Sequence, residues 1–268
     1  MDSAYSFKIY TATNQLPENW DDLAVSTIFL SKQYLRVLEK SSPNNMICQF
    51  IGLFKNNTLI GTAISQFLDL NALESFGERD KCIKTAVRNI VFTKFASQVL
   101  VVGNNMLTGQ NCFAFAKNVD EEKALQALHA ATTEIKNNFK SFGINIHITT
   151  YKDFCEEEIK KFSIPEFKQD YLFSTQPNMV FSIEENWKTE QNYIDALSKK
   201  YRDQYKRARK KAVTIEKRKL NLDDIIALED TIYDLYLHVA KNAPFNTFFL
   251  PKNHFRIFKE IFKEKFLF

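Results

Sequence analysis

The residues best suited to chemistry lie in one basic stretch between residues 199 and 219. Eleven of its 21 residues are Lys or Arg, against only Asp203 and Glu216, so the stretch carries +9 in a chain of net charge +4. Helical spacing predicts that most of the basic side chains share one face, largely opposite Tyr201 and Tyr205. The residues expected on this face are Lys199, Arg202, Lys206, Arg209 and Lys210. Such a face could hold the phosphates of a nucleotide-linked precursor or a tRNA backbone. The alternative is an ordinary solvated helix face.

A second candidate site is the segment GNNMLTG over residues 103–109, which follows a strongly apolar run. Two of the six glycines of the chain, Gly103 and Gly109, lie within it. Ligands of open α/β sheets bind beyond the ends of strands, and Asn104 and Thr108 could offer hydrogen bonds there. The alternative is a structural turn in which the glycines supply a positive φ.

Several common kinds of site are disfavoured by the spacing of the residues. No pair of glycines fits G-x-G-x-x-G or G-x-x-x-x-G-K-[ST], which argues against Rossmann and Walker-type nucleotide sites. The four cysteines form no C-x-x-C and the four histidines do not pair at i, i+4, so we expect no metal site and no tightly bound cofactor. We also find no secretory signal and no apolar run long enough to span a bilayer, and therefore expect a cytoplasmic protein.

The elements that must position these residues are those of a globular α/β protein. The chain is 45% hydrophobic and 25% charged, close to the average of globular proteins. Apolar alternation predicts strands over residues 6–12, 46–54, 58–68, 97–103, 112–116, 144–150, 171–174 and 179–183. Helical spacing and capping residues predict helices over residues 31–40, 78–95, 120–141 and 153–162. Strands interleaved with helices in this way predict a mixed sheet covered by helices on both faces.

A second set of elements follows residue 184. We expect a helix over 189–212, a strand over 213–220, helices over 222–241 and 252–263, and a strand beginning at 265. The order repeats the opening of the first set and then stops. The sequence therefore predicts two domains, 1–184 and 185–268, of which the second is incomplete, and favours a chain that is a truncated version of a longer protein.

Four stretches of the sequence resemble those of a known protein family. They are VVGNNMLTGQNCFAF (101–115), QPNMVFSI (176–183), EQNYIDA (190–196) and LSKKYRDQYKRARKK (197–211). Together with the order of elements they resemble the GNAT acyltransferase superfamily, in particular bacterial proteins related to the Fem-type peptidoglycan-bridge aminoacyltransferases. The resemblance implies a GNAT-like lobe followed by a partial second GNAT-like lobe, with the active cleft between them. It also implies that Arg202 and Tyr205 bind the precursor.

This chain departs from the GNAT pattern at the donor site. The family's [QR]-x-x-G-x-[GA] loop, which cradles the diphosphate of coenzyme A, has its nearest counterpart in QFIGLF (49–54), inside a predicted strand. Fem-type relatives use an aminoacyl-tRNA donor and do not need that loop, so its absence weighs against acetyl-CoA.

The function that we expect from these residues is N-acyl or aminoacyl transfer by direct attack of an amine. The acyl donor would be acyl-CoA or aminoacyl-tRNA, and the acceptor a small amine or a cell-wall precursor. The incomplete second lobe leaves the activity of these 268 residues by themselves uncertain. The alternative is a non-catalytic or truncated protein that binds an anionic partner, such as tRNA, through the basic helix over 199–211.

Overall fold

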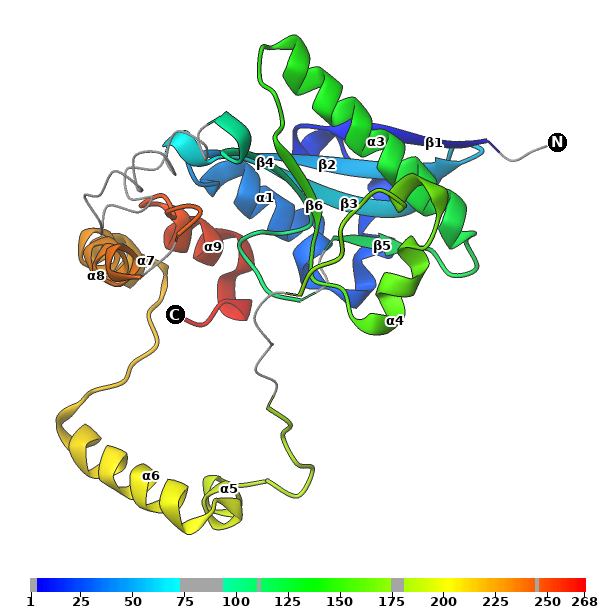
Figure 1. Cartoon of the computed structure of the whole chain (residues 1–268). Coiled ribbons are helices and arrows are strands. Elements are labelled where there is room, and N and C mark those ends of the chain that lie inside the picture. Colours follow the sequence, from blue (N-terminus) through cyan, green and yellow to red (C-terminus); the bar gives the residue numbers. More distant parts are fainter. Residues whose placement is uncertain (1–3, 73–93, 110–111, 175–180, 244–245) are drawn as a thin grey trace, which may run out of the picture. The chain divides into compact units, whose positions relative to one another are not determined.

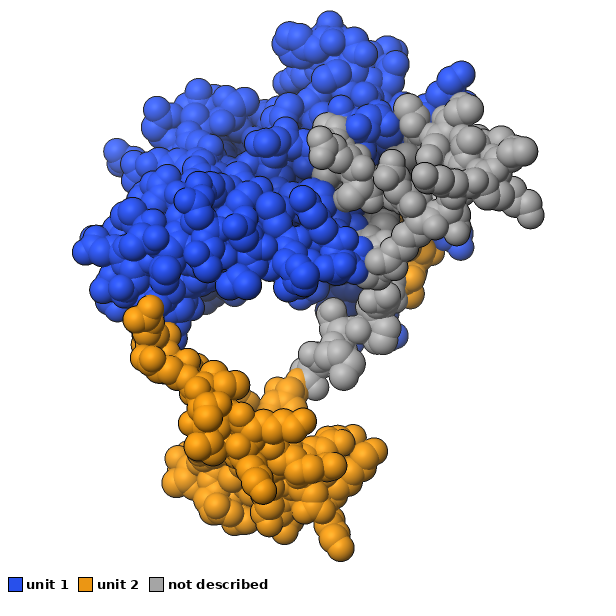
Figure 2. All heavy atoms as spheres, turned by 90° about the vertical axis from the view of Figure 1, so that its left-hand side faces the viewer, with its two compact units in different colours: residues 1–171, 220–268 blue, residues 172–219 orange. Residues whose placement is uncertain are grey.

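The computed structural model falls into two compact units, which we describe separately (Figures 1 and 2). The described residues are 4–72, 94–109, 112–174, 181–243 and 246–268. The first unit is formed by residues 1–171 together with 220–268, and the second by residues 172–219. Our predicted boundary after residue 184 placed everything from residue 185 onward in a second lobe. In the structure, residues 220–268 instead pack within the first unit.

The centre of the first unit is a six-stranded, mostly antiparallel sheet, so the mixed α/β class is confirmed (Figure 1). Its strands are β1 (Tyr5–Tyr10), β2 (Met46–Lys55), β3 (Thr58–Asp69), β4 (Gln98–Val102), β5 (Phe113–Phe115) and β6 (Ile148–Tyr151). The strand order is β1-β2-β3-β4-β6, and β5 also pairs with β3. Among the described strands, only β4 and β6 pair in parallel.

The hairpin between β2 and β3 confirms the turn that the sequence predicts. Asn56 and Asn57 connect the two strands with φ angles of 50° and 65°. Asn tolerates this left-handed region better than most residues, because its short polar side chain hydrogen-bonds locally. The turn fixes the register in which β2 and β3 pair along nearly their whole length.

Helices cover both faces of the sheet, as the sequence predicts. On one face, α3 (Glu121–Ser141) packs against alternate residues of β2, β3 and β4. On the other face lie α1 (Lys32–Ser41) and α9 (His254–Phe262). Both α1 and α3 begin at a residue whose side chain accepts a hydrogen bond from the third backbone N–H of the helix, namely Ser31 and Asp120. Each face therefore has its own apolar core.

Shorter helices complete the two units. The first unit contains α4 (Glu156–Ile159), α7 (Leu222–Ala227) and α8 (Glu229–Asn242), and the second contains α5 (Glu190–Ala196) and α6 (Lys199–Lys211). Single 3-10 turns span Thr13–Gln15, Glu18–Asp22, Ala24–Ser26, Ile28–Leu30, Leu70–Ala72, Lys160–Phe162, Pro165–Phe167, Ala212–Thr214 and Lys263–Lys265.

Three of the predicted strands are wrong. Residues 171–174, 213–220 and 265–268 form no strand. Their side chains are mostly exposed, and alternation of apolar residues makes a strand only where a neighbouring strand and a face to bury are available. The last two segments approach each other at one point, where Leu220 N donates a hydrogen bond to Phe268 O over 2.8 Å.

Two long helices are also wrong in detail. The helix predicted over 189–212 is divided into α5 and α6, because Leu197 and Ser198 adopt extended backbone angles between them. The helix predicted over 222–241 is divided at Leu228. The helix predicted over 78–95 lies largely outside the described residues. Of the strand predicted over 179–183, residues 179–180 lie outside them, and residues 181–183 form no strand.

Candidate functional site

The sheet is interrupted where β4 ends. Gly103 N donates to Ile64 O over 2.9 Å, and Ile64 N donates to Cys112 O over 3.1 Å. β4 therefore leaves β3 after Gly103, and the chain returns to the same line on β3 at Cys112 to form β5. The two strands are halves of one strand position, separated by a loop that begins with the predicted segment 103–109.

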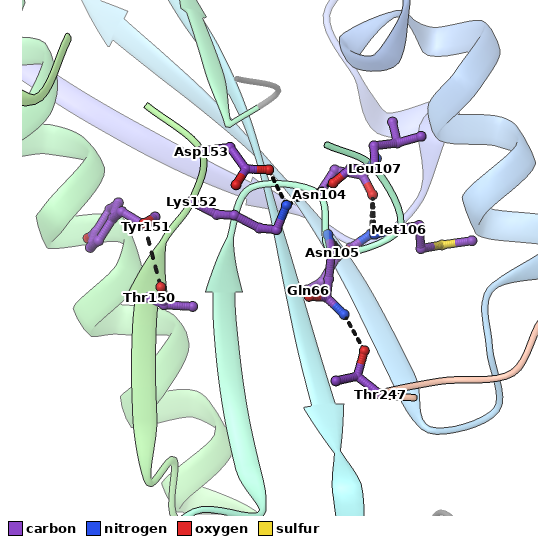
Figure 3. Close-up of polar contacts among 10 residues, drawn as sticks. All are labelled: Gln66, Asn104, Asn105, Met106, Leu107, Thr150, Tyr151, Lys152, Asp153 and Thr247. Carbon is purple, nitrogen blue, oxygen red and sulfur yellow. Dashed lines mark hydrogen bonds and ion pairs between the residues drawn. The ribbon is translucent and has the colours of Figure 1, made fainter. Parts of the chain in front are cut away.

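This loop lies beside the end of a second strand. β6 runs parallel to β4, and their last paired residues are Val102 and Tyr151. Gly103 and Lys152 directly follow these two residues, so the carboxyl ends of two adjacent parallel strands lie at the same edge. Figure 3 shows Lys152 and Asp153 there, beside residues 104–107 of the loop. Such an edge is where ligands of α/β sheets most often bind. We refer to residues 103–109 with Lys152 and Asp153 as the strand-end site.

The close approach of the two strand ends requires a glycine at position 103. Its φ is 131°, and a Cβ added there would lie 3.3 Å from Lys152 Cβ. Few L-residues adopt such a φ, and the added atom would press on the neighbouring strand end. The glycine that the sequence singled out thus allows the chain to turn out of the sheet at this edge.

A charged pair lies in the strand-end site. Lys152 Nζ donates to Leu107 O over 2.8 Å and forms an ion pair with the carboxylate of Asp153 (Figure 3). The two side chains are only 24% and 22% exposed. Asp153 has a φ of 63°, an uncommon conformation for a residue other than glycine. Sequence reasoning missed this pair, because nothing in the local sequence indicates that residue 152 meets the loop after β4.

Asn104 is buried and its amide is used within the protein. Its Nδ2 donates to Tyr34 Oη over 3.0 Å, while its Oδ1 accepts from Met106 N over 3.0 Å and from Gln66 Nε2 over 3.4 Å. Gln66, which is fully buried on β3, also accepts from Asn105 N over 2.6 Å. Asn104 therefore positions the loop rather than offering its amide at the surface. Thr108, the other loop residue predicted from sequence, is exposed.

The segment between α8 and α9 also holds the loop. Asn105 Nδ2 donates to Thr247 Oγ1 over 2.9 Å (Figure 3). Thr247 O in turn accepts from Asn45 Nδ2 over 3.0 Å. Asn45 from the first chain segment of this unit and Thr247 from the second thus fix the base of the loop. These contacts are a physical reason why residues 220–268 belong to the first unit.

Two ionisable side chains beneath the loop are unreactive at neutral pH. Burial raises the pKa of Tyr34 to about 12, although its hydrogen bond with Asn104 acts in the opposite direction. Burial also raises the pKa of the Cys48 thiol to about 11. Both groups stay protonated and serve the hydrogen-bond network. The half-buried ion pair of Lys152 and Asp153 is the charged feature of this edge.

The start of α3 carries negative charge. Asp120 caps the helix, and Glu121 and Glu122 occupy its first turn. These carboxylates suit the positive end of the helix dipole, but they disfavour the binding of a phosphate group at that end. This helix therefore lacks the electrostatics of a diphosphate cradle.

In the second unit, Arg202 and Tyr205, the two residues that the family resemblance implies bind the precursor, hold α5 against α6. Arg202 Nη2 donates to Leu197 O over 2.9 Å and to Asp195 O over 3.1 Å, and so caps the carboxyl end of α5. Tyr205 Oη hydrogen-bonds to Glu190 at the start of α5. Arg202 thus turns toward α5 as Tyr205 does, which corrects our expectation that it lies opposite Tyr205. A role of either residue in substrate binding stays a prediction.

The other predicted residues of α6 are exposed. Lys199, Lys206 and Arg209 point into solvent, and no buried residue lies on this helix. Within the part of the chain that the structure describes, no ion pair involves a basic residue of 199–219. The positive charge of this stretch is therefore not neutralised within its own unit.

The described residues contain neither a metal-binding cluster nor a helix that could span a membrane. No three His, Cys, Asp or Glu side chains among them gather closely enough to hold a metal ion. None of the helices described has the length and apolar character needed to cross a bilayer.

Comparison with known proteins found no match: no family model, no curated protein and no solved structure is similar to this chain.

Proposed function

We propose that the protein transfers an acyl group to an amine at the strand-end site. The observation that carries this proposal is the half-buried Lys152–Asp153 pair beside the interruption of β4, at the carboxyl ends of two parallel strands. Direct transfer needs a neutral amine, alignment of the two substrates and donors for the developing oxyanion. The pair supplies an acid–base couple at a fixed position.

Each member of the pair has a role in this reaction. Asp153 accepts one proton from the acceptor's ammonium group, and the resulting amine attacks the carbonyl carbon of the donor. Lys152 uses one N–H for Leu107 O and one for Asp153, which leaves a third N–H for the oxyanion. This attack forms the C–N bond. The C–O or C–S bond of the donor then breaks, and the leaving group takes a second proton from the attacking nitrogen.

The donor is an ester or a thioester, and we favour the ester of an aminoacyl-tRNA. Support comes from the acidic first turn of α3 and from the absence of a glycine-rich diphosphate loop in the sequence. The acceptor belongs to the class of small amines or amine-bearing cell-wall precursors.

The test is an acylation assay with labelled acetyl-CoA and, separately, labelled aminoacyl-tRNA, offered with a panel of amines. We expect Asp153→Asn and Lys152→Met to lower turnover by about 100-fold or more, the usual contribution of general acid–base groups. Asp22→Asn, which removes an exposed carboxylate elsewhere in the first unit, should leave turnover unchanged. Absence of product with both donors, or equal turnover in all variants, would refute the proposal.

A second function is favoured by the uncompensated charge of α6. We propose that the second unit binds an anionic partner through the exposed basic residues of this helix. The test is elution from a heparin column in a salt gradient. Replacement of Lys206, Arg207, Lys210 and Lys211 by Gln should lower the salt concentration at elution, whereas Lys136→Gln with Lys140→Gln on α3 should not. Equal elution of both variants would contradict this function.

A further inference from the structure

The second unit exposes aliphatic side chains before α5 and after its basic helix α6. Ile183 is 77% exposed before α5, and Val213 and Ile215 are 82% and 70% exposed directly after α6. Large apolar side chains this exposed, within a unit of 48 residues, exceed what packing of the unit itself explains. They mark a surface that another apolar phase can cover.

The same unit is strongly cationic. Residues 172–219 contain twelve Lys and Arg against six Asp and Glu, a net charge of +6, whereas the whole chain carries +4. The cations of α6 therefore need an anionic partner. The charge identifies the sign of that partner, and the aliphatic side chains identify its chemistry.

Aliphatic side chains favour a lipid surface over RNA. Bases of single-stranded RNA stack on aromatic faces, which Ile183, Val213 and Ile215 lack. Trp187 lies 5.3 Å from Tyr193 and 5.8 Å from Phe181 between ring centroids. Phe181 and Tyr201 are nevertheless 67% and 55% exposed, and because aromatic rings suit both partners, the aliphatic side chains decide between them. Peripheral membrane proteins, by contrast, combine basic side chains at the headgroups with apolar side chains among the acyl chains.

We propose that the second unit binds the surface of an anionic lipid bilayer, with α6 along the headgroups and the exposed aliphatic residues, above all Val213 and Ile215 directly after α6, inserted beneath them. This inference rests on the proposed anion binding of α6 and names its partner. It is independent of acyl transfer at the strand-end site.

The experiment is sedimentation of the full chain with vesicles. One set contains phosphatidylcholine alone, and the other contains phosphatidylcholine mixed with phosphatidylglycerol. We expect binding to the mixed vesicles only, with an affinity that falls as salt is raised. Replacing Lys206, Arg207, Lys210 and Lys211 by Gln should weaken binding by about 600-fold, since each basic residue near an anionic surface contributes roughly fivefold.

A second variant tests insertion. Val213→Ser combined with Ile215→Ser should weaken binding about tenfold or more. The matched control is Leu235→Ser combined with Val239→Ser, which removes equally exposed apolar residues of α8 in the first unit and should not change binding.

Competition with tRNA distinguishes the two levels of the proposal. Binding to tRNA through the same four basic residues, without binding to either vesicle, would overturn the lipid assignment and leave anion binding intact. Binding to neither would overturn both. Equal binding to neutral and mixed vesicles, or an unchanged affinity of the Val213→Ser, Ile215→Ser variant, would also overturn the proposal.

Discussion

Two polar residues on β3 differ in whether their buried side chains have partners, and the difference predicts opposite effects on stability. Gln66 accepts from Asn105 N over 2.6 Å and is fully buried. Thr62, four residues earlier and on the same face of the strand, is equally buried, but its hydroxyl has no hydrogen-bond partner. Gln66→Met leaves the N–H of Asn105 unpaired. Thr62→Val removes an orphaned hydroxyl at nearly constant volume.

The magnitudes follow from the cost of an unpaired polar group. An orphaned buried donor costs about 1–3 kcal/mol, so Gln66→Met should lower the free energy of unfolding by about 2 kcal/mol. With a urea dependence of about 2 kcal/mol per molar, the unfolding midpoint should fall by about 1 M. Thr62→Val should be neutral or should raise the free energy of unfolding by about 1 kcal/mol, because its hydroxyl is buried without a bond.

The assay is urea unfolding followed by the fluorescence of Trp20. This residue is fully buried in the first unit, and its indole N–H donates to Leu30 O over 2.9 Å. The other tryptophan, Trp187, is replaced by Phe in every protein measured, so the signal reports the first unit alone. Equal midpoints for the two variants, or a more destabilising Thr62→Val, would refute the reasoning from hydrogen-bond partners.

Three further predictions follow from single residues. Gly103→Ala should lower the free energy of unfolding by more than Gly143→Ala does. Both glycines have a positive φ, but only a Cβ at position 103 would lie within 3.4 Å of a neighbour, Lys152. Urea unfolding measures both free energies. Burial lowers the pKa of His254, so the folded state holds this side chain neutral. The stabilisation that neutral His254 provides is complete above its unfolded pKa near 6.5 and declines below it. The difference in free energy of unfolding between wild type and His254→Gln should therefore shrink from pH 7 to pH 5, by up to about 1.4 kcal/mol per pH unit. A difference that does not depend on pH would contradict this. Arg202→Gln should remove the cap on α5 and weaken the packing of α5 on α6 by about 1–2 kcal/mol. The measurement is amide hydrogen exchange, which should become faster across residues 190–197. Unchanged exchange would contradict the role of Arg202 as a cap.

Local signals in the sequence were sufficient for much of the first unit. The Asn56–Asn57 turn sets a hairpin by its own backbone preferences, and α3 shows both a capping residue and an uninterrupted apolar stripe. Each of these signals lies within a few residues of the element that it predicts. The strands and the helical layers of the sheet could accordingly be placed in advance.

The candidate site was only half predictable, because its members come from distant parts of the chain. The glycines at 103 and 109 drew attention to the loop after β4. Lys152 joins it only because β6 pairs in parallel with β4, and Gln66 and Tyr34 do so because β3 and α1 lie beneath it. The apolar residues of 213–220 gave a misleading signal, since alternation indicates a strand only where pairing partners exist.

The most direct test of the strand-end site is amide hydrogen exchange of the whole chain with and without an acyl donor and an amine acceptor. We predict slower exchange across residues 103–109 and at Lys152 and Asp153 when both substrates are bound, and the same protection in Asp153→Asn, which binds both substrates but converts them slowly. Protection confined to other parts of the chain, with no change at these two strand ends, would contradict the account.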